Sequence, residues 1–224
     1  MGKTNYILAD FAATVQSRFP ERAQELRMAV DKRMKQLRQL YGGATKEMRF
    51  HLENQIIPGI AVYETLCRVM PREEAVAVFH GYVEKRAWRE KKLFLRLMQL
   101  PGLYRRVPGL FTKYTRRLFG ERAGFSFTEI DTSKGAWRID MTRCPYHDAC
   151  VRCGCPELCH CFCDSDDITY DHLHKRLYWH RTKTLGRGDD CCDFCLRIRE
   201  EGNEKVPHRK EYRTGDIGDP AVRA

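Results

Sequence analysis

The side chains best suited to chemistry are concentrated in one window of this 224-residue chain. Ten of the eleven cysteines and five of the eight histidines lie between Cys144 and Cys195. The first residues lack the basic and apolar regions of a secretory signal, so we expect a cytoplasmic protein. In that reducing compartment, cysteines act as thiols, metal ligands or redox centres rather than as disulfides. We therefore expect the functional site in this window.

Two CxxC pairs in the window have the spacing of zinc knuckles, Cys150 with Cys153 and Cys192 with Cys195. The 38 residues between the pairs exceed the usual interval of roughly 15–20 residues. A divalent metal, zinc or manganese, therefore stays one interpretation, and the cofactor remains unknown. The candidate metal ligands are Cys144, His147, Cys163 and Cys192.

A helix over residues 155–170 would align thiols and carboxylates. Cys155, Cys159, Cys163 and either Asp166 or Asp167 follow one another at steps of three or four residues, which places them on one helical face. This row could face a pocket between the helix and a sheet. Most other cysteines in the window suit small apolar core positions, a common role of free cysteine.

The stretch from Arg181 to Phe194 has two interpretations. Its glycine-containing turn could present backbone N–H groups to an anion, and Arg181 could hold a carboxylate through two hydrogen bonds. Alternatively, Arg181 lies on a strand at the surface, and Gly186 and Gly188 only form the turn. The residue pattern leaves both open.

Several short motifs resemble those of the L-2-amino-thiazoline-4-carboxylic acid hydrolase family, most strongly over residues 137–194. They are Cys144-Pro145-Tyr146, Pro156-Glu157, Phe162-Cys163-Asp164-Ser165-Asp166, Arg181-Thr182-Lys183-Thr184-Leu185 with Gly188, and Cys192-Asp193-Phe194. The resemblance implies a soluble bacterial enzyme that opens a cyclic, amidine-like thiazoline with water and forms a carbamoyl-cysteine. A looser similarity, to ligand-binding domains of the 4-vinyl reductase type, implies an α+β sheet that holds a small molecule.

Hydrolysis at the ring C2 atom needs a nucleophile, an acid or base, and a group that holds the substrate carboxylate. The residues given these roles are Cys163 or Cys192 as nucleophile or ligand of an activated water, Asp166 or Asp193 as acid/base, and Arg181, Thr184 and Gly188 in substrate binding. We expect a small carboxylate-bearing substrate and no nucleic acid partner. The alternative function is a non-catalytic module that binds or senses a small molecule or zinc.

The elements that must position these residues begin with a helical first half. Apolar residues recur at three- and four-residue steps over residues 21–41, where Gly42-Gly43 ends the helix. A second helix is predicted over residues 46–70, bent at Pro58-Gly59, and a third from Pro71 to Pro101-Gly102.

The second half changes to a sheet-forming pattern. A hairpin is predicted over residues 125–130 and 136–141, followed by the helix at 155–170 and strands at 177–185 and 192–199. The fold class is therefore α+β, with a helical N-terminal half and an antiparallel ββαββ unit. The predicted organisation is a helical region over 1–120, a cysteine-rich α+β region over 121–200 that carries the site, and a frayed polar tail over 201–224.

The basic excess belongs to the first half alone. Residues 1–120 hold 23 Lys and Arg against 11 Asp and Glu, whereas residues 121–224 hold 17 against 19. The basic, amphipathic stretch at residues 91–119 is best interpreted as a solvated helix face, and contact with an anionic membrane surface is the minor alternative. No apolar run reaches the roughly 18 residues of a membrane span, and the oligomeric state stays open.

Overall fold

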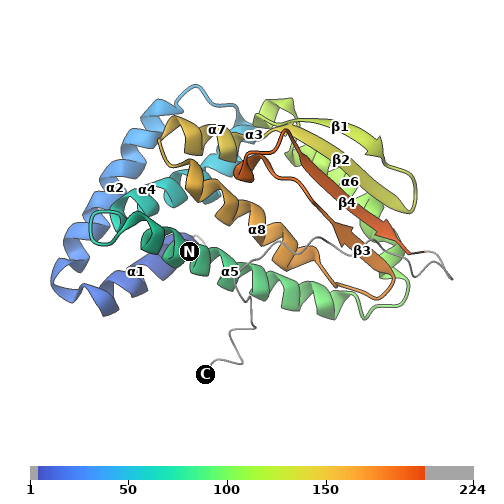
Figure 1. Cartoon of the computed structure of the whole chain (residues 1–224), viewed down its shortest axis with the longest axis horizontal. Coiled ribbons are helices and arrows are strands. Elements are labelled where there is room, and N and C mark those ends of the chain that lie inside the picture. Colours follow the sequence, from blue (N-terminus) through green and yellow to red (C-terminus); the bar gives the residue numbers. More distant parts are fainter. Residues whose placement is uncertain (1–4, 200–224) are drawn as a thin grey trace.

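The computed structural model describes residues 5–199 and has the predicted α+β architecture, with a helical half followed by a four-stranded antiparallel sheet (Figure 1). The predicted tail at 201–224 lies outside the described residues. No helix among the described residues is both long and apolar enough to cross a membrane.

Six α-helices build the first half. They are α1 (Tyr6–Arg18), α2 (Ala23–Leu40), α3 (Lys46–His51), α4 (Ile57–Leu66), α5 (Arg72–Leu97) and α6 (Val107–Leu118). The helix predicted over 21–41 is confirmed as α2, and α5 ends a few residues before the predicted Pro101-Gly102. Helix α1 is not among the predicted elements, although its buried residues Ile7, Phe11 and Val15 recur at four-residue steps.

The break in the second predicted helix comes earlier than expected. A π-helical turn, Leu52–Ile56, separates α3 from α4, whereas Pro58 lies in the first turn of α4, where its missing N–H is not needed. The prediction of a bend at Pro58-Gly59 was therefore wrong. Gly59 instead permits close packing, because a Cβ there would lie 2.6 Å from Cζ of Phe162.

The sheet has the strand order β1-β2-β4-β3, and all its pairs are antiparallel. Its strands are β1 (Ser126–Asp131), β2 (Ala136–Arg143), β3 (Leu177–His180) and β4 (Cys192–Ile198). The strand predicted over 177–185 ends at His180. Beyond it, the backbone N–H groups of Thr182 and Lys183 donate to the Asp193 carboxylate, and that of Thr184 donates to Asp189, so this backbone forms a loop.

Two helices are inserted between the hairpin and the last two strands. Helix α7 (Pro145–Arg152) is not predicted, and α8 (Cys159–Tyr170) confirms most of the helix predicted over 155–170. Helix α8 runs between the N-terminal helices and the sheet (Figure 1).

Residues 5–199 contain two apolar cores, and neither follows the predicted boundary at residue 120. Cys150, Cys159 and Phe162 from α7 and α8 join the core of the N-terminal helices. Val107 of α6 packs with the sheet residues instead. The division into regions 1–120 and 121–200 stays a prediction.

Candidate functional site

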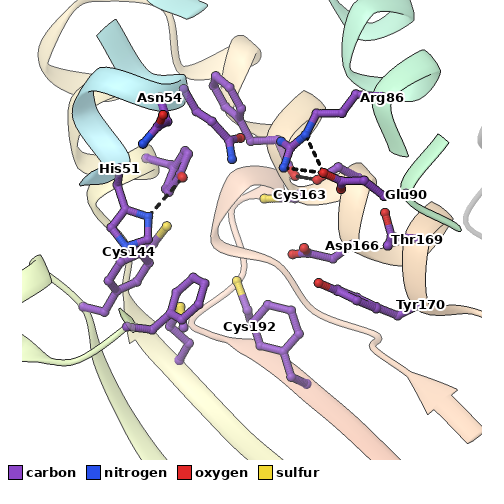
Figure 2. A pocket seen from close by; sticks show the side chains of 18 of the residues that line it. His51, Asn54, Arg86, Glu90, Cys144, Cys163, Asp166, Thr169, Tyr170 and Cys192 are labelled. Atoms are coloured by element: carbon purple, nitrogen blue, oxygen red, sulfur yellow. Dashed lines mark hydrogen bonds and ion pairs between the residues drawn. The ribbon is translucent and has the colours of Figure 1, made fainter. Parts of the chain in front are cut away.

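A pocket of about 530 Å³ lies between α8, the N-terminal helices and the sheet (Figure 2). This volume is typical of small-molecule sites. Five of the residues singled out from the sequence line the pocket together: Cys144, Cys163, Asp166, Arg181 and Cys192. They come from the start of α7, from α8, from the residue after β3 and from the start of β4.

Arg181 is a buried cation whose hydrogen-bonding capacity is only partly used. Its side chain is 1 % exposed, and its Nη2 donates to the Cys163 carbonyl and to Oδ2 of Asp167, both at 2.7 Å. Its Nε and Nη1 have no hydrogen-bond acceptor among the described residues. A buried guanidinium with unused N–H groups at a pocket wall is suited to hold a carboxylate.

Asp166 faces the same pocket from α8. Its Oδ2 lies 3.6 Å from Nη1 of Arg181, and its side chain is 39 % exposed because it borders the cavity. Burial in the surrounding protein raises the pKa of Asp166 to about 6, against the opposing effect of the Arg181 charge. A carboxyl group with this pKa can accept and return a proton near neutral pH.

Asp167 holds Arg181 in place from the adjoining position. Its Oδ1 accepts a hydrogen bond from Nε1 of Trp179 at 2.8 Å, and its Oδ2 accepts the bond from Arg181. Of the two carboxylates between which the sequence left the choice open, Asp166 lines the pocket and Asp167 does not.

Three thiols lie on the pocket wall, and their surroundings favour the protonated form. Burial raises the pKa of Cys144 above its usual range and that of Cys192 to about 12. A hydrogen bond with Cys159, followed by burial, raises the pKa of Cys163 well above its usual range. A thiol becomes a strong nucleophile only after it loses its proton, so these surroundings make all three weak nucleophiles.

His51 lies opposite Asp166 across the pocket (Figure 2), and its pairing with Tyr146 was not found by sequence reasoning. His51 Nε2 lies 2.8 Å from the Leu118 carbonyl, which can only accept, so this nitrogen carries the proton. The Nδ1 atom therefore accepts from the Tyr146 hydroxyl at 3.2 Å. Burial lowers the pKa of His51, which keeps the ring neutral. His51 precedes Tyr146 by 95 positions, and no motif links them.

The π-helical turn and α5 line another part of the pocket. Asn54 belongs to the turn, and Arg86 donates to Glu90 at 2.9 Å along α5 (Figure 2). The pocket thus contains charges of both signs. A π-helical turn is often found at a functional site because it shifts side chains out of the α-helical pattern.

Other residues predicted to bind or react lie outside this pocket. Asp193 accepts hydrogen bonds from Thr182 and Lys183 and borders a separate hollow with His180 on the sheet. Gly188 has a positive φ of 89° and ends a 3-10 turn, Leu185–Arg187, which agrees with the purely structural interpretation of that glycine. Asp193 and Gly188 are thus not among the residues that line the pocket of Arg181.

Thr184 and His147 also lie outside the pocket. Thr184 is buried in the loop after β3, and its backbone N–H donates to Asp189. His147 lies on α7 with its Nδ1 3.9 Å from Asp148.

The candidate metal ligands do not form a coordination site. Cys144, Cys163 and Cys192 line the pocket, whereas His147 does not. Within residues 5–199, no group of three His, Cys, Asp or Glu side chains is arranged to hold a metal ion. The two CxxC pairs also lie in different parts of the fold, because Cys150 belongs to the helical core and Cys192 to the sheet core.

Comparisons with known proteins agree with the motifs. A search of curated proteins finds no match to this chain. The family model of L-2-amino-thiazoline-4-carboxylic acid hydrolase matches residues 49–196, about two-thirds of the chain. The matched range runs from α3 to β4 and includes every pocket residue discussed above. The chain therefore belongs to the L-2-amino-thiazoline-4-carboxylic acid hydrolase family.

Proposed function

We propose that the protein hydrolyses a small cyclic amidine that carries a carboxylate, as 2-amino-thiazoline-4-carboxylate does. Family membership suggests a hydrolase that opens a ring. The observation that carries the proposal is the pairing of Asp166 with Arg181 on one pocket wall. This substrate has a carboxylate and a basic amidine group, so it matches a pocket with charges of both signs.

Arg181 holds the substrate carboxylate in this proposal. Its Nε and Nη1 atoms supply the N–H groups, and Asp167 and the Cys163 carbonyl keep the guanidinium in place. A charge-assisted hydrogen bond is stronger in a buried site than in water because the local dielectric is low. The ring would then lie against Asp166, whose carboxylate can also pair with the amidine cation.

Asp166 acts as the general base. It removes one proton from water as the water oxygen bonds to the ring C2 atom, and it gives this proton to the ring nitrogen as the C2=N double bond becomes a single bond. The bond from C2 to the ring sulfur or nitrogen then breaks, and the proton of the new C2 hydroxyl passes through Asp166 to the departing atom as C2=O forms. The sum is one substrate and one water giving one carbamoyl-cysteine. The raised pKa values of Cys163 and Cys192 favour water over a thiol as the nucleophile.

The test is an assay of the purified full-length chain on 2-amino-thiazoline-4-carboxylate, with carbamoyl-cysteine measured by mass spectrometry. We expect turnover by the wild type, which addition of a chelator does not abolish. We also expect Arg181→Lys to raise KM about tenfold or more, because lysine cannot reproduce the planar guanidinium contact.

A second substrate isolates the role of Arg181. On 2-amino-thiazoline without the carboxylate, wild type and Arg181→Lys should have similar kcat/KM values. Saturable binding of the carboxylate compound without turnover would refute the hydrolase and favour a ligand-binding module. Equal losses by Arg181→Lys on both substrates would refute the carboxylate contact.

A further inference from the structure

The segment 91–119, here called the basic segment, has a one-sided charge. It contains eight Lys and Arg residues and no Asp or Glu. It begins in the last part of α5 and ends just after α6. The enzyme proposed above makes no use of its side chains except Phe119, which lines the pocket.

Exposed apolar side chains are also concentrated in the basic segment. Of the eleven large hydrophobic residues that are exposed within residues 5–199, six belong to it. These six are Leu93, Leu95, Leu97, Leu100, Leu110 and Tyr114. Their exposed fractions range from 36 % to 55 %, so large parts of these side chains contact water. Apolar side chains concentrated in one exposed segment are typical of an interaction surface.

The exposed residues form the same pattern on two successive stretches. Leu93, Arg96, Leu97 and Leu100 follow one another at steps of three, one and three residues near the end of α5. Leu110, Lys113, Tyr114 and Arg117 repeat these steps on α6. All eight are exposed. Each stretch therefore presents an outward face that carries both apolar and basic side chains.

Both faces belong to one end of the molecule. Phe94 of α5 and Phe111 of α6 both contact the ring of Tyr170, with centroid distances of 5.9 Å and 5.0 Å. The inner sides of the two helices are thus fixed to the same residue of α8. Figure 1 shows the end of α5 and helix α6 at the end of the molecule opposite α1 and α2.

Most of the positive charges on this surface are not neutralised by the described part of the chain. Arg116 pairs with Glu129. No ion pair within residues 5–199 involves five other basic residues of the segment, which are Lys92, Arg96, Arg106, Lys113 and Arg117. The surface is therefore electrostatically complementary to an anionic partner.

We propose that the basic segment binds the surface of an anionic lipid bilayer, with leucine side chains inserted among the headgroups and basic side chains paired with lipid phosphates and carboxylates. Interleaved leucine and basic residues are typical of peripheral membrane helices. A single-stranded nucleic acid would instead need aromatic side chains on which bases can stack, and Tyr114 is the one exposed aromatic residue of the segment in this structure. This binding does not depend on the hydrolase proposal.

Vesicle co-sedimentation of the full-length protein tests the proposal. We expect binding to vesicles of phosphatidylcholine with phosphatidylserine, weak binding to phosphatidylcholine alone, and loss of binding at high salt. Lys113→Gln with Arg117→Gln should weaken binding about 30-fold, because each basic residue near the surface contributes about fivefold. Leu93→Ser with Leu97→Ser should weaken binding at low salt, although this variant keeps every positive charge of the segment.

Matched variants on other elements control for general effects of charge and apolarity. The control for charge is Lys32→Gln with Lys35→Gln on α2, and the control for apolar side chains is Met28→Ser with Val151→Ser. All four residues are exposed, and vesicle binding by both double variants should stay within twofold of wild type. Circular dichroism of every variant verifies that it is folded.

Three outcomes would overturn the proposal. The first is no binding to anionic vesicles at low salt, and the second is an equal effect of the control and test variants. The third is a concentration-dependent dimer, or tight binding to single-stranded nucleic acid, that the leucine variants abolish while vesicle binding is absent. That result would assign the surface to another partner.

Discussion

At the scale of single residues, the surroundings of Asp166 raise its pKa, which suits its proposed role as a base but lowers the stability of the folded protein when Asp166 is ionised. Its pKa of about 6 lies above the value of about 3.9 for an aspartate in an unfolded chain. The folded protein therefore binds this proton more tightly than the unfolded chain does. The stability that the protonated group contributes is complete below pH 4 and is lost as the pH rises through 6.

Asp166→Asn should consequently separate stability from activity. At pH 7 we expect an equal or higher Tm than wild type, because the variant has no carboxylate to ionise at this pocket wall, and this difference should shrink below pH 4. Thermal unfolding followed by circular dichroism at both pH values measures it. Asp148→Asn, at a surface ion pair with Arg143, is the control and should not raise the Tm. A lower Tm for Asp166→Asn at pH 7 would contradict the stated pKa.

The thiols give a second prediction at this scale. Cys163→Ala and Cys192→Ala should each retain turnover within about tenfold of wild type, because both thiols stay protonated at neutral pH and water is the proposed nucleophile. Steady-state rates and mass spectrometry of the quenched enzyme measure turnover and any covalent adduct. A trapped adduct on either cysteine, together with loss of turnover in its alanine variant, would show that this thiol is the nucleophile instead of water.

At the scale of elements, the periodic patterns predict most helices and the hairpin, and they fail where tertiary contacts decide the conformation. The stretch after β3 has residues that suit a strand, yet its N–H groups bond to the Asp193 and Asp189 carboxylates. Likewise, Pro58-Gly59 has the composition of a bend, but the π-helical turn comes before it. Neither the carboxylate contacts of the loop after β3 nor the position of the π-helical turn could be identified from the local sequence.

Gly59→Ala tests the role that the structure gives to this glycine. An added Cβ would lie 2.6 Å from Cζ of Phe162, so that ring must move, and Phe162 lines the pocket. We expect a loss of roughly 1–3 kcal/mol in the free energy of unfolding and a higher KM. Urea unfolding and steady-state kinetics measure the two effects.

Gly81→Ala is the matched control for that variant. Gly81 lies on α5 with no neighbouring atom within 4 Å of the added Cβ. Alanine should therefore stabilise the helix by up to about 1 kcal/mol and leave KM unchanged. Equal stability changes for both variants would mean that the contact between α4 and α8 is looser than described.

At the scale of the whole molecule, the pocket lies where the helical core and the sheet core meet on α8. Helical periodicity predicts that Cys163 and Asp166 share a face, and the family motifs point to Arg181 and Cys192. The pairing of His51 with Tyr146 and the position of Arg86 depend on how distant helices pack. Sequence reasoning could not find them because no local pattern records such contacts.

A ligand that contacts both cores should stabilise the whole fold. A non-hydrolysable analogue of the thiazoline carboxylate, at 100 times its Kd, should add about 2.7 kcal/mol to the free energy of unfolding. Thermal shift measurements across analogue concentrations determine this gain. Arg181→Lys should need a higher analogue concentration for the same shift. An identical concentration dependence would show that the analogue binds elsewhere.

The most direct test of the central claim is the pH dependence of kcat/KM for 2-amino-thiazoline-4-carboxylate. We expect an acid limb near pH 6 in the wild type, because the proposed activity requires ionised Asp166. Asp166→Asn should lose about 10²–10⁴-fold in kcat/KM and lose this limb. Full activity of Asp166→Asn with an unchanged acid limb would contradict the proposed role of Asp166.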